Sequence, residues 1–242
     1  MKKIIYGCIV LVLCAFILTG CGVNTKTIKR MQSLEEGVSS PTTIEELETA
    51  IKKYQERVED IVLADQQTGI WYKMLGSRYL DNKMYGKALE AFQKATEYYP
   101  ANPNLYFYVA ICAGNMAKQS LDYTAIGSTA QKYNYFKLAE DAYLRALELD
   151  PRYARALYGI GILYAYELDE PLKAIPYLQR LLEIEKLNTD GMFALARAYY
   201  TTYDFDNAIA MYDRIIATTQ SPEKKLQAEE NKKTVLEALH AR

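Results

Sequence analysis

Histidine and cysteine side chains are the first candidates for chemistry in this sequence, and they are few, with one histidine and four cysteines. His240 is the only histidine, and Cys112 stands far from it. A nucleophile needs a neighbouring base, and a transition-metal site needs clustered His and Cys ligands. No Gly-rich phosphate loop is present. The sequence therefore predicts no catalytic residue, no metal and no cofactor. Five acids in predicted turns are explained by capping and solvation: Glu167, Asp169, Glu170, Asp204 and Asp206.

The composition fits a helical protein without a nucleic-acid partner. Half of the 242 residues are apolar and the net charge is -1, whereas a nucleic-acid binder normally has a basic surplus. The 22 tyrosines, one tryptophan and modest glycine content favour helical repeats with aromatic seams over strands with frequent turns. The charge balance leaves protein partners open.

Residues 1–20 have the layout of a secretory signal. Lys2 and Lys3 precede an apolar run from Ile4 to Leu18, which is short for a bilayer span. The run ends in Leu18-Thr19-Gly20-Cys21, which resembles the lipobox of bacterial lipoproteins. The resemblance implies cleavage before Cys21 and acylation of its thiol, with palmitate or a similar chain. The alternatives are a cleaved signal with an incidental cysteine, or an uncleaved anchor.

The lipoprotein interpretation has consequences for the envelope location and for the cysteines. In an envelope with two membranes, Gly22 after the lipidated cysteine leaves the outer membrane as the default, on its periplasmic or cell-surface face. Cys8 and Cys14 would leave with the signal, so Cys112 alone would remain and no internal disulfide is expected. Residues 21–42 are polar and read as a tether.

One pattern of small and large residues organises the rest of the chain. It comprises Tyr72, Leu75, Gly76, Tyr79, Ala88, Phe92, Ala95 and Pro100. This spacing resembles the tetratricopeptide repeat, a 34-residue helix-turn-helix unit. The resemblance implies an all-α, right-handed superhelical solenoid of helical hairpins with a C-terminal capping helix. Gly76 and Ala88 would let two helices approach closely, while the larger residues fill the seam.

The repeat pattern divides the chain into successive elements. Residues 43–68 are expected to form an amphipathic helix that acts as a half-repeat and covers the first full one. The further predicted units are repeat 1 over 69–102, repeat 2 over 103–153, repeat 3 over 154–188, repeat 4 over 189–221, and a polar capping helix over 222–242. Repeat 3 has one extra residue in its turn near Pro171.

Repeat 2 contains 17 extra residues, roughly between 115 and 133. This insertion is too apolar for a purely solvated loop. Either both helices of the hairpin are lengthened and pack on each other, or a flap protrudes that contacts the partner or another copy of the chain. Insertions in repeats often serve binding.

In tetratricopeptide proteins the first helix of each hairpin lines a concave groove. The resemblance places at this groove Lys73, Ser77, Asn104, Phe107, Ile111, Arg155, Tyr158, Ile162, Tyr166, Phe193, Arg197 and Tyr200. The repeats that clamp chaperone tails use Lys and Asn where this chain has Lys73 and Ser77. The departure argues against such a tail, and the aromatic and arginine side chains favour a hydrophobic peptide, helix or apolar ligand.

These features predict a lipid-anchored, non-enzymatic scaffold that binds an envelope protein or peptide, or helps to assemble a complex there. The alternative is a ligand-binding partner of a solute transporter, as in the similar tetratricopeptide lipoproteins associated with TRAP-type transporters. An enzyme is the third hypothesis, and it lacks any catalytic set.

Overall fold

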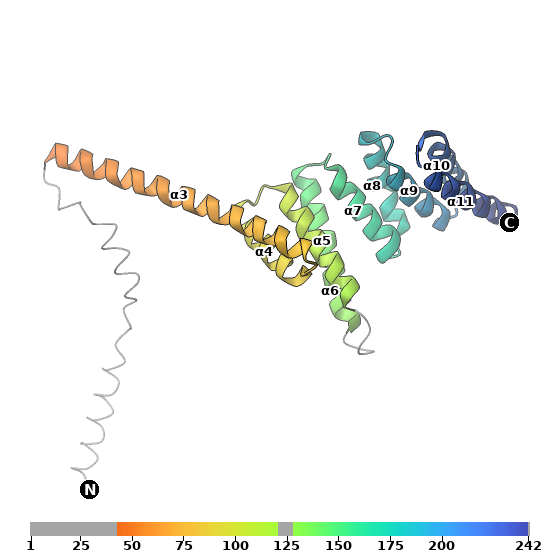
Figure 1. Ribbon diagram of the computed structural model, residues 1–242, viewed down its shortest axis with the longest axis horizontal. Coiled ribbons are helices and arrows are strands. Elements are labelled where there is room, and N and C mark those ends of the chain that lie inside the picture. The colour runs from red at the N-terminus through yellow and green to blue at the C-terminus, as the bar shows by residue number, and fades with distance from the viewer. Residues whose placement is uncertain (1–42, 121–127, 242) are drawn as a thin grey trace, which may run out of the picture. The chain divides into compact units, whose positions relative to one another are not determined.

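The computed structural model describes residues 43–120 and 128–241, and within them it is helical without strands (Figure 1). This confirms the predicted all-α fold. The signal segment, Cys21 and the tether lie outside the described residues. The helices are α3 (Ile44–Asp81), α4 (Tyr85–Tyr98), α5 (Pro103–Gln119), α6 (Ser128–Leu149), α7 (Ala154–Ile162) with a π-helical end η1 (Leu163–Glu167), α8 (Pro171–Ile184), α9 (Thr189–Thr201), α10 (Phe205–Thr218) and α11 (Pro222–His240).

The chain divides into two compact units, residues 1–64 and 65–242. In the first unit, the start of α3 is fixed by a reciprocal capping box. The Glu46 backbone N–H donates to Thr43 Oγ1 at 3.2 Å, and the Thr43 N–H donates to Glu46 Oε2 at 3.1 Å. The large apolar side chains that follow, from Ile44 to Leu63, are exposed.

Helix α3 does not end where the half-repeat was expected to end, at residue 68. No proline or capping residue interrupts the helix, and Gly69 does not end it. A Cβ on Gly69 would lie 2.5 Å from Tyr98 Cβ, so this glycine permits close approach of α4. Residues 43–68 and the first helix of repeat 1 are therefore one helix.

In the second unit, each helix from α4 to α11 packs on the next helix in sequence, and the small residues of the repeat pattern make this possible. A Cβ on Gly76 would lie 2.9 Å from the Phe92 ring, and one on Gly161 would lie 2.5 Å from Leu178 Cδ2. Ala88 is fully buried. Burying a large apolar side chain contributes about 1.5–3 kcal/mol, so these seams hold the stack together.

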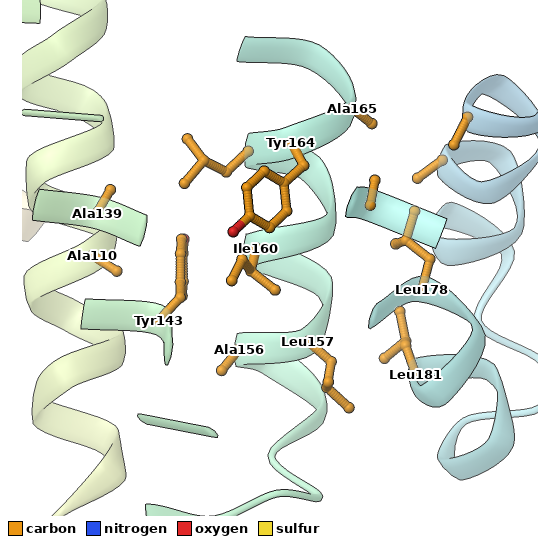
Figure 2. Close-up of a cluster of buried hydrophobic side chains, with 14 of the residues drawn as sticks. Ala110, Ala139, Tyr143, Ala156, Leu157, Ile160, Tyr164, Ala165, Leu178 and Leu181 are labelled. Carbon is orange, nitrogen blue, oxygen red and sulfur yellow. The ribbon is translucent and has the colours of Figure 1, made fainter. Parts of the chain in front are cut away.

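Figure 2 shows the core on both sides of α7. The Tyr143 ring of α6 lies against α7, where a Cβ on Gly159 would come within 2.5 Å of it. On the opposite side, Leu178 and Leu181 of α8 are fully buried. The core is thus one continuous hydrophobic cluster that passes from hairpin to hairpin.

The insertion in repeat 2 is built, in its described parts, as helix. Helix α5 runs to Gln119 and α6 begins at Ser128, so 115–119 and 128–133 lengthen the two helices of this hairpin. Phe136 near the start of α6 is buried, whereas Tyr133 is exposed. Residues 121–127, which carry Leu121, Tyr123 and Ile126, lie outside the described part. A flap there, and self-association through it, stay predictions.

The extra residue of repeat 3 lies within a helix. In repeats 1 and 4 the residue with positive φ that ends the first helix comes four positions after a tyrosine: Lys83 after Tyr79, and Tyr203 after Tyr199. In repeat 3 the corresponding Asp169 comes five positions after Tyr164. The π-helical turn η1, which contains Tyr164 and ends at Glu167, accommodates the additional residue. The prediction from the sequence placed this extra residue in the turn near Pro171.

Helix α11 ends the stack. Ser221 caps it by accepting from the Lys224 N–H, and Pro222 occupies its first turn. Two ion pairs dock it on the preceding hairpin: Lys224 Nζ to Asp190 Oδ1 and Lys232 Nζ to Asp213 Oδ1, both 2.6 Å. None of the helices within 43–120 and 128–241 has the length and apolar character needed to cross a membrane.

Candidate binding groove

Nine of the twelve predicted groove residues line two adjoining hollows in the second unit. We call them the central hollow, about 380 Å³, and the C-terminal hollow, about 530 Å³. Tyr158 and Ile162 of α7 belong to both, so they form the wall between them. The other seven are Phe107, Ile111 and Arg155 in the central hollow and Tyr166, Phe193, Arg197 and Tyr200 in the C-terminal one.

The central hollow lies between α5, α6 and α7 and has a mostly apolar lining. The Arg155 guanidinium stacks over the Phe107 ring at 4.2 Å and thereby covers part of the hollow with a charged but flat group. Lys118 and Glu167 form an ion pair of 2.7 Å that also belongs to the lining. Gly114 faces this space, since a Cβ there would meet nothing within 4 Å.

The C-terminal hollow is richer in aromatic and polar groups. The Arg197 guanidinium stacks over the Tyr166 ring at 4.5 Å. Phe193 packs at 60° to the Tyr212 ring, with centroids 6.2 Å apart. Helix α11 closes the far side with three uncharged polar residues, Gln227, Asn231 and Thr234.

The charges that line the hollows are unevenly compensated. Lys118 pairs with Glu167, and Asp190 pairs with Lys224. Within 43–120 and 128–241, neither Arg155 nor Arg197 forms an ion pair with a carboxylate. Each hollow therefore contains one guanidinium that stacks on a ring and can still donate hydrogen bonds to a carboxylate of a bound partner.

Burial raises the pKa of two tyrosines that line the hollows. It raises the pKa of Tyr158, with Asp190 adding to the effect, and it raises the pKa of Tyr166 although Arg197 opposes it. Both phenols consequently stay protonated at neutral pH. They present hydrogen-bond donors on apolar rings, a combination typical of protein interfaces.

Three predicted groove residues do not line either hollow. Lys73 is exposed, and the Ser77 Oγ donates to the Lys73 carbonyl at 3.1 Å. The Asn104 Oδ1 accepts from the Tyr153 hydroxyl at 2.6 Å, which ties the starts of α5 and α7 together. Asn104 therefore has a structural partner, and repeat 1 contributes nothing to the two hollows.

Sequence reasoning missed the contribution of α11. Gln227, Asn231 and Thr234 were not singled out because the helix was read as a charged cap. Their spacing of four and three places them on one helical face, and they interrupt the charged pattern with uncharged polar groups. This stripe of uncharged polar residues was the sequence feature that could have identified them.

The other residues considered for chemistry have structural roles. Cys112 is fully buried and forms no disulfide, and burial raises its pKa to about 12, which keeps the thiol protonated. His240 is exposed, and its ring Nδ1 lies 2.7 Å from the Leu236 carbonyl. Asp204 caps α10. The described residues contain no cluster of three potential metal ligands.

Stacked helical hairpins, here with two adjoining hollows lined by aromatic residues, are typical of repeat proteins that bind other proteins or peptides. Two family models of the tetratricopeptide repeat match this chain, one over residues 72–102 and the other over 124–184 and 162–223. The matches span more than half of the sequence, and the chain is a tetratricopeptide-repeat protein. No catalytic family is indicated.

Similar proteins support the same assignment. A TPR repeat-containing protein of Borreliella burgdorferi is 27% identical over 220 residues, 89% of this chain and 93% of that protein. A thermophilic TPR protein of Thermus thermophilus has a TM-score of 0.54 at 20% identity, covering 80% of this chain and 92% of its own. YrrB, a TPR protein with an unusual peptide-binding site, has a TM-score of 0.53 at 21% sequence identity, and the match covers 77% of this chain and 85% of that chain. These structures are alike in fold.

Proposed function

We propose that this protein is a lipid-anchored, non-enzymatic tetratricopeptide scaffold that binds an envelope protein through its groove. The observation that carries the binding role is the pair of adjoining hollows, in which two stacked arginines and several half-buried rings remain accessible. Aromatic and arginine side chains are the usual anchors of protein interfaces.

The chemistry of the hollows indicates what kind of segment would bind. Their rings and aliphatic side chains favour an apolar or aromatic segment. Arg155 and Arg197, one in each hollow, favour a segment that also carries carboxylates. A peptide can place one side chain on each side of Tyr158, whereas a compact ligand fills one hollow only. We therefore favour a protein segment with aromatic and acidic residues.

The proposal of an envelope location depends on the sequence alone. The apolar run followed by Leu18-Thr19-Gly20-Cys21 supports a lipid anchor, and Gly22 supports the outer membrane. Each buried CH₂ of an acyl chain contributes about 0.8 kcal/mol, so several chains would hold the protein firmly at a membrane.

One observation favours the alternative, a ligand-binding subunit beside a TRAP-type solute transporter. The central hollow is mostly apolar, and its volume of about 380 Å³ lies in the usual range for small-molecule sites, about 300–1,000 Å³. An apolar molecule could occupy it alone.

Purification of the full chain from detergent-solubilised envelope, with native mass spectrometry, tests both functions. We expect one dominant partner protein, with loss of at least 10-fold in its recovery for Tyr158→Ala combined with Phe193→Ala, because both rings line the hollows. Leu172→Ala, an exposed position on α8 outside them, is the control. An intact fold that retains no protein would contradict the scaffold, and a co-purifying small molecule would favour the alternative. Loss of helicity in the double variant would instead mean that the two rings are core residues.

A further inference from the structure

The first unit contains an apolar surface that the groove does not use. Along α3, six side chains recur at alternating intervals of three and four residues: Ile44, Leu47, Ile51, Tyr54, Val58 and Ile61. All six are exposed, from 41% for Tyr54 to 77% for Ile44. We call them the α3 seam.

The spacing of the α3 seam is that of a coiled coil. A straight amphipathic helix follows a period of 3.6 residues, whereas intervals of three and four in strict alternation give 3.5. In heptad notation, Ile44, Ile51 and Val58 occupy position a, and Leu47, Tyr54 and Ile61 occupy position d. The pattern stops at Asp65 and Thr68, which would be the next a and d residues. The seam thus comprises three heptads within 44–64.

The identities of the seam residues select the partner. All three a positions are β-branched, which together with leucine at d favours two strands in parallel coiled coils. The d positions are Leu47, Tyr54 and Ile61, so the first heptad has this combination in full. A helix with this pattern is complementary to a second copy of itself in register. We propose that the α3 seam pairs two copies of this chain as a parallel coiled coil.

The charges agree with pairing between identical helices. Most charged residues lie at positions b, c and f, away from the seam: Glu45, Glu46, Lys52, Lys53, Glu56, Glu59 and Asp60. In a parallel pair, position g faces position e of the partner's next heptad. This brings Ala50 opposite Gln55 and Arg57 opposite Val62, so no like charges meet. Pairing through the seam is independent of what the groove binds.

Cysteine cross-linking in the full chain tests both contact and direction. Val58→Cys places a thiol at position a of the third heptad, which faces the same residue of the other copy only when the helices are parallel. An antiparallel pair would place it near Leu47. Leu63→Cys is the matched control, because it is two-thirds exposed on the same helix but lies at position f. We expect oxidation of Val58→Cys to give at least 5-fold more disulfide-linked dimer than oxidation of Leu63→Cys or of the unchanged chain.

Sedimentation of the full chain in detergent, corrected for bound detergent, gives the independent measurement. We expect a protein mass that rises toward two chains with concentration, and a single-chain mass for Ile51→Glu with Val58→Glu. Thr49→Glu with Leu63→Glu adds the same charges outside the seam and should still pair. All these positions are exposed, so circular dichroism should show an unchanged fold. A single-chain mass for the unchanged protein at all concentrations, or equal cross-linking at both cysteines, would overturn the proposal.

Discussion

At the scale of single residues, the glycines separate positions that pack from positions that line the groove. Gly159 touches the Tyr143 ring, with only 2.5 Å between that ring and the place where a Cβ would lie. Gly114, on α5, has nothing within 4 Å of the corresponding place. The two residues look equivalent in the sequence, because both are glycines in the first helix of a repeat.

This contrast predicts opposite effects of the same substitution. Gly159→Ala should destabilise the protein by about 1–3 kcal/mol, since Tyr143 is buried and must shift. Gly114→Ala should stabilise it by about 0.5–1 kcal/mol, because alanine favours the helix and meets no neighbour. Urea unfolding followed by circular dichroism measures both. Equal effects of the two substitutions on the free energy of unfolding would show that the Tyr143 ring does not hinder a side chain at position 159.

The sequence predicted the buried residues between the helices of each hairpin, whereas its assignment of the groove residues stays a prediction. The repeat spacing assigns residues such as Phe92 and Leu178 to the core because their roles depend only on position within the hairpin. Asn104 lies outside both hollows and accepts a hydrogen bond from Tyr153, which lies 49 residues away in the chain. Contacts between repeats are not contained in the pattern of one repeat.

At the scale of helices, local caps fix where the elements begin. Asn188 caps α9 by accepting from the Gly191 N–H at 2.7 Å, while Asp204 and Ser221 cap α10 and α11. These signals were readable from the sequence. The π-helical turn η1 was not, since residue counting shows that repeat 3 has one residue too many but not whether a helix or a loop contains it.

The cap of α9 gives a prediction at this scale. Asn188→Ala should lower the free energy of unfolding by about 0.5–2 kcal/mol, because the first turn of α9 loses its acceptor. Asn188→Asp keeps an acceptor oxygen and should retain most of the stability. Thermal unfolding of the three proteins distinguishes them, and an unchanged midpoint for Asn188→Ala would mean that water replaces the cap.

At the scale of the whole molecule, the sequence identified the repeats but not how the helices join. The spacing from 69 onward marked the start of repeat 1, yet α3 continues through that point because nothing in the sequence stops it. A repeat pattern records which residues pack, and helix ends depend on caps and prolines instead.

Attachment to the membrane is tested at this scale by Cys21→Ala. We expect the precursor to lose its acyl chains and the folded part to leave the membrane fraction, or maturation to stop, because the thiol is the proposed site of acylation. Metabolic labelling with a fatty acid and cell fractionation give the readout, with Cys112→Ala as the control at a buried cysteine. Unchanged labelling of Cys21→Ala would contradict the lipobox assignment.

The open space at Gly114 has a consequence for how such a protein can diverge. Residues in the seams constrain one another, so a change at Gly159 or Gly161 requires a compensating change across the helix pair. Gly114 has no such neighbour, and a larger side chain there would reduce the central hollow while leaving the stack intact. Descendants of this chain could therefore alter what they bind by drift at a single site, without first losing their fold.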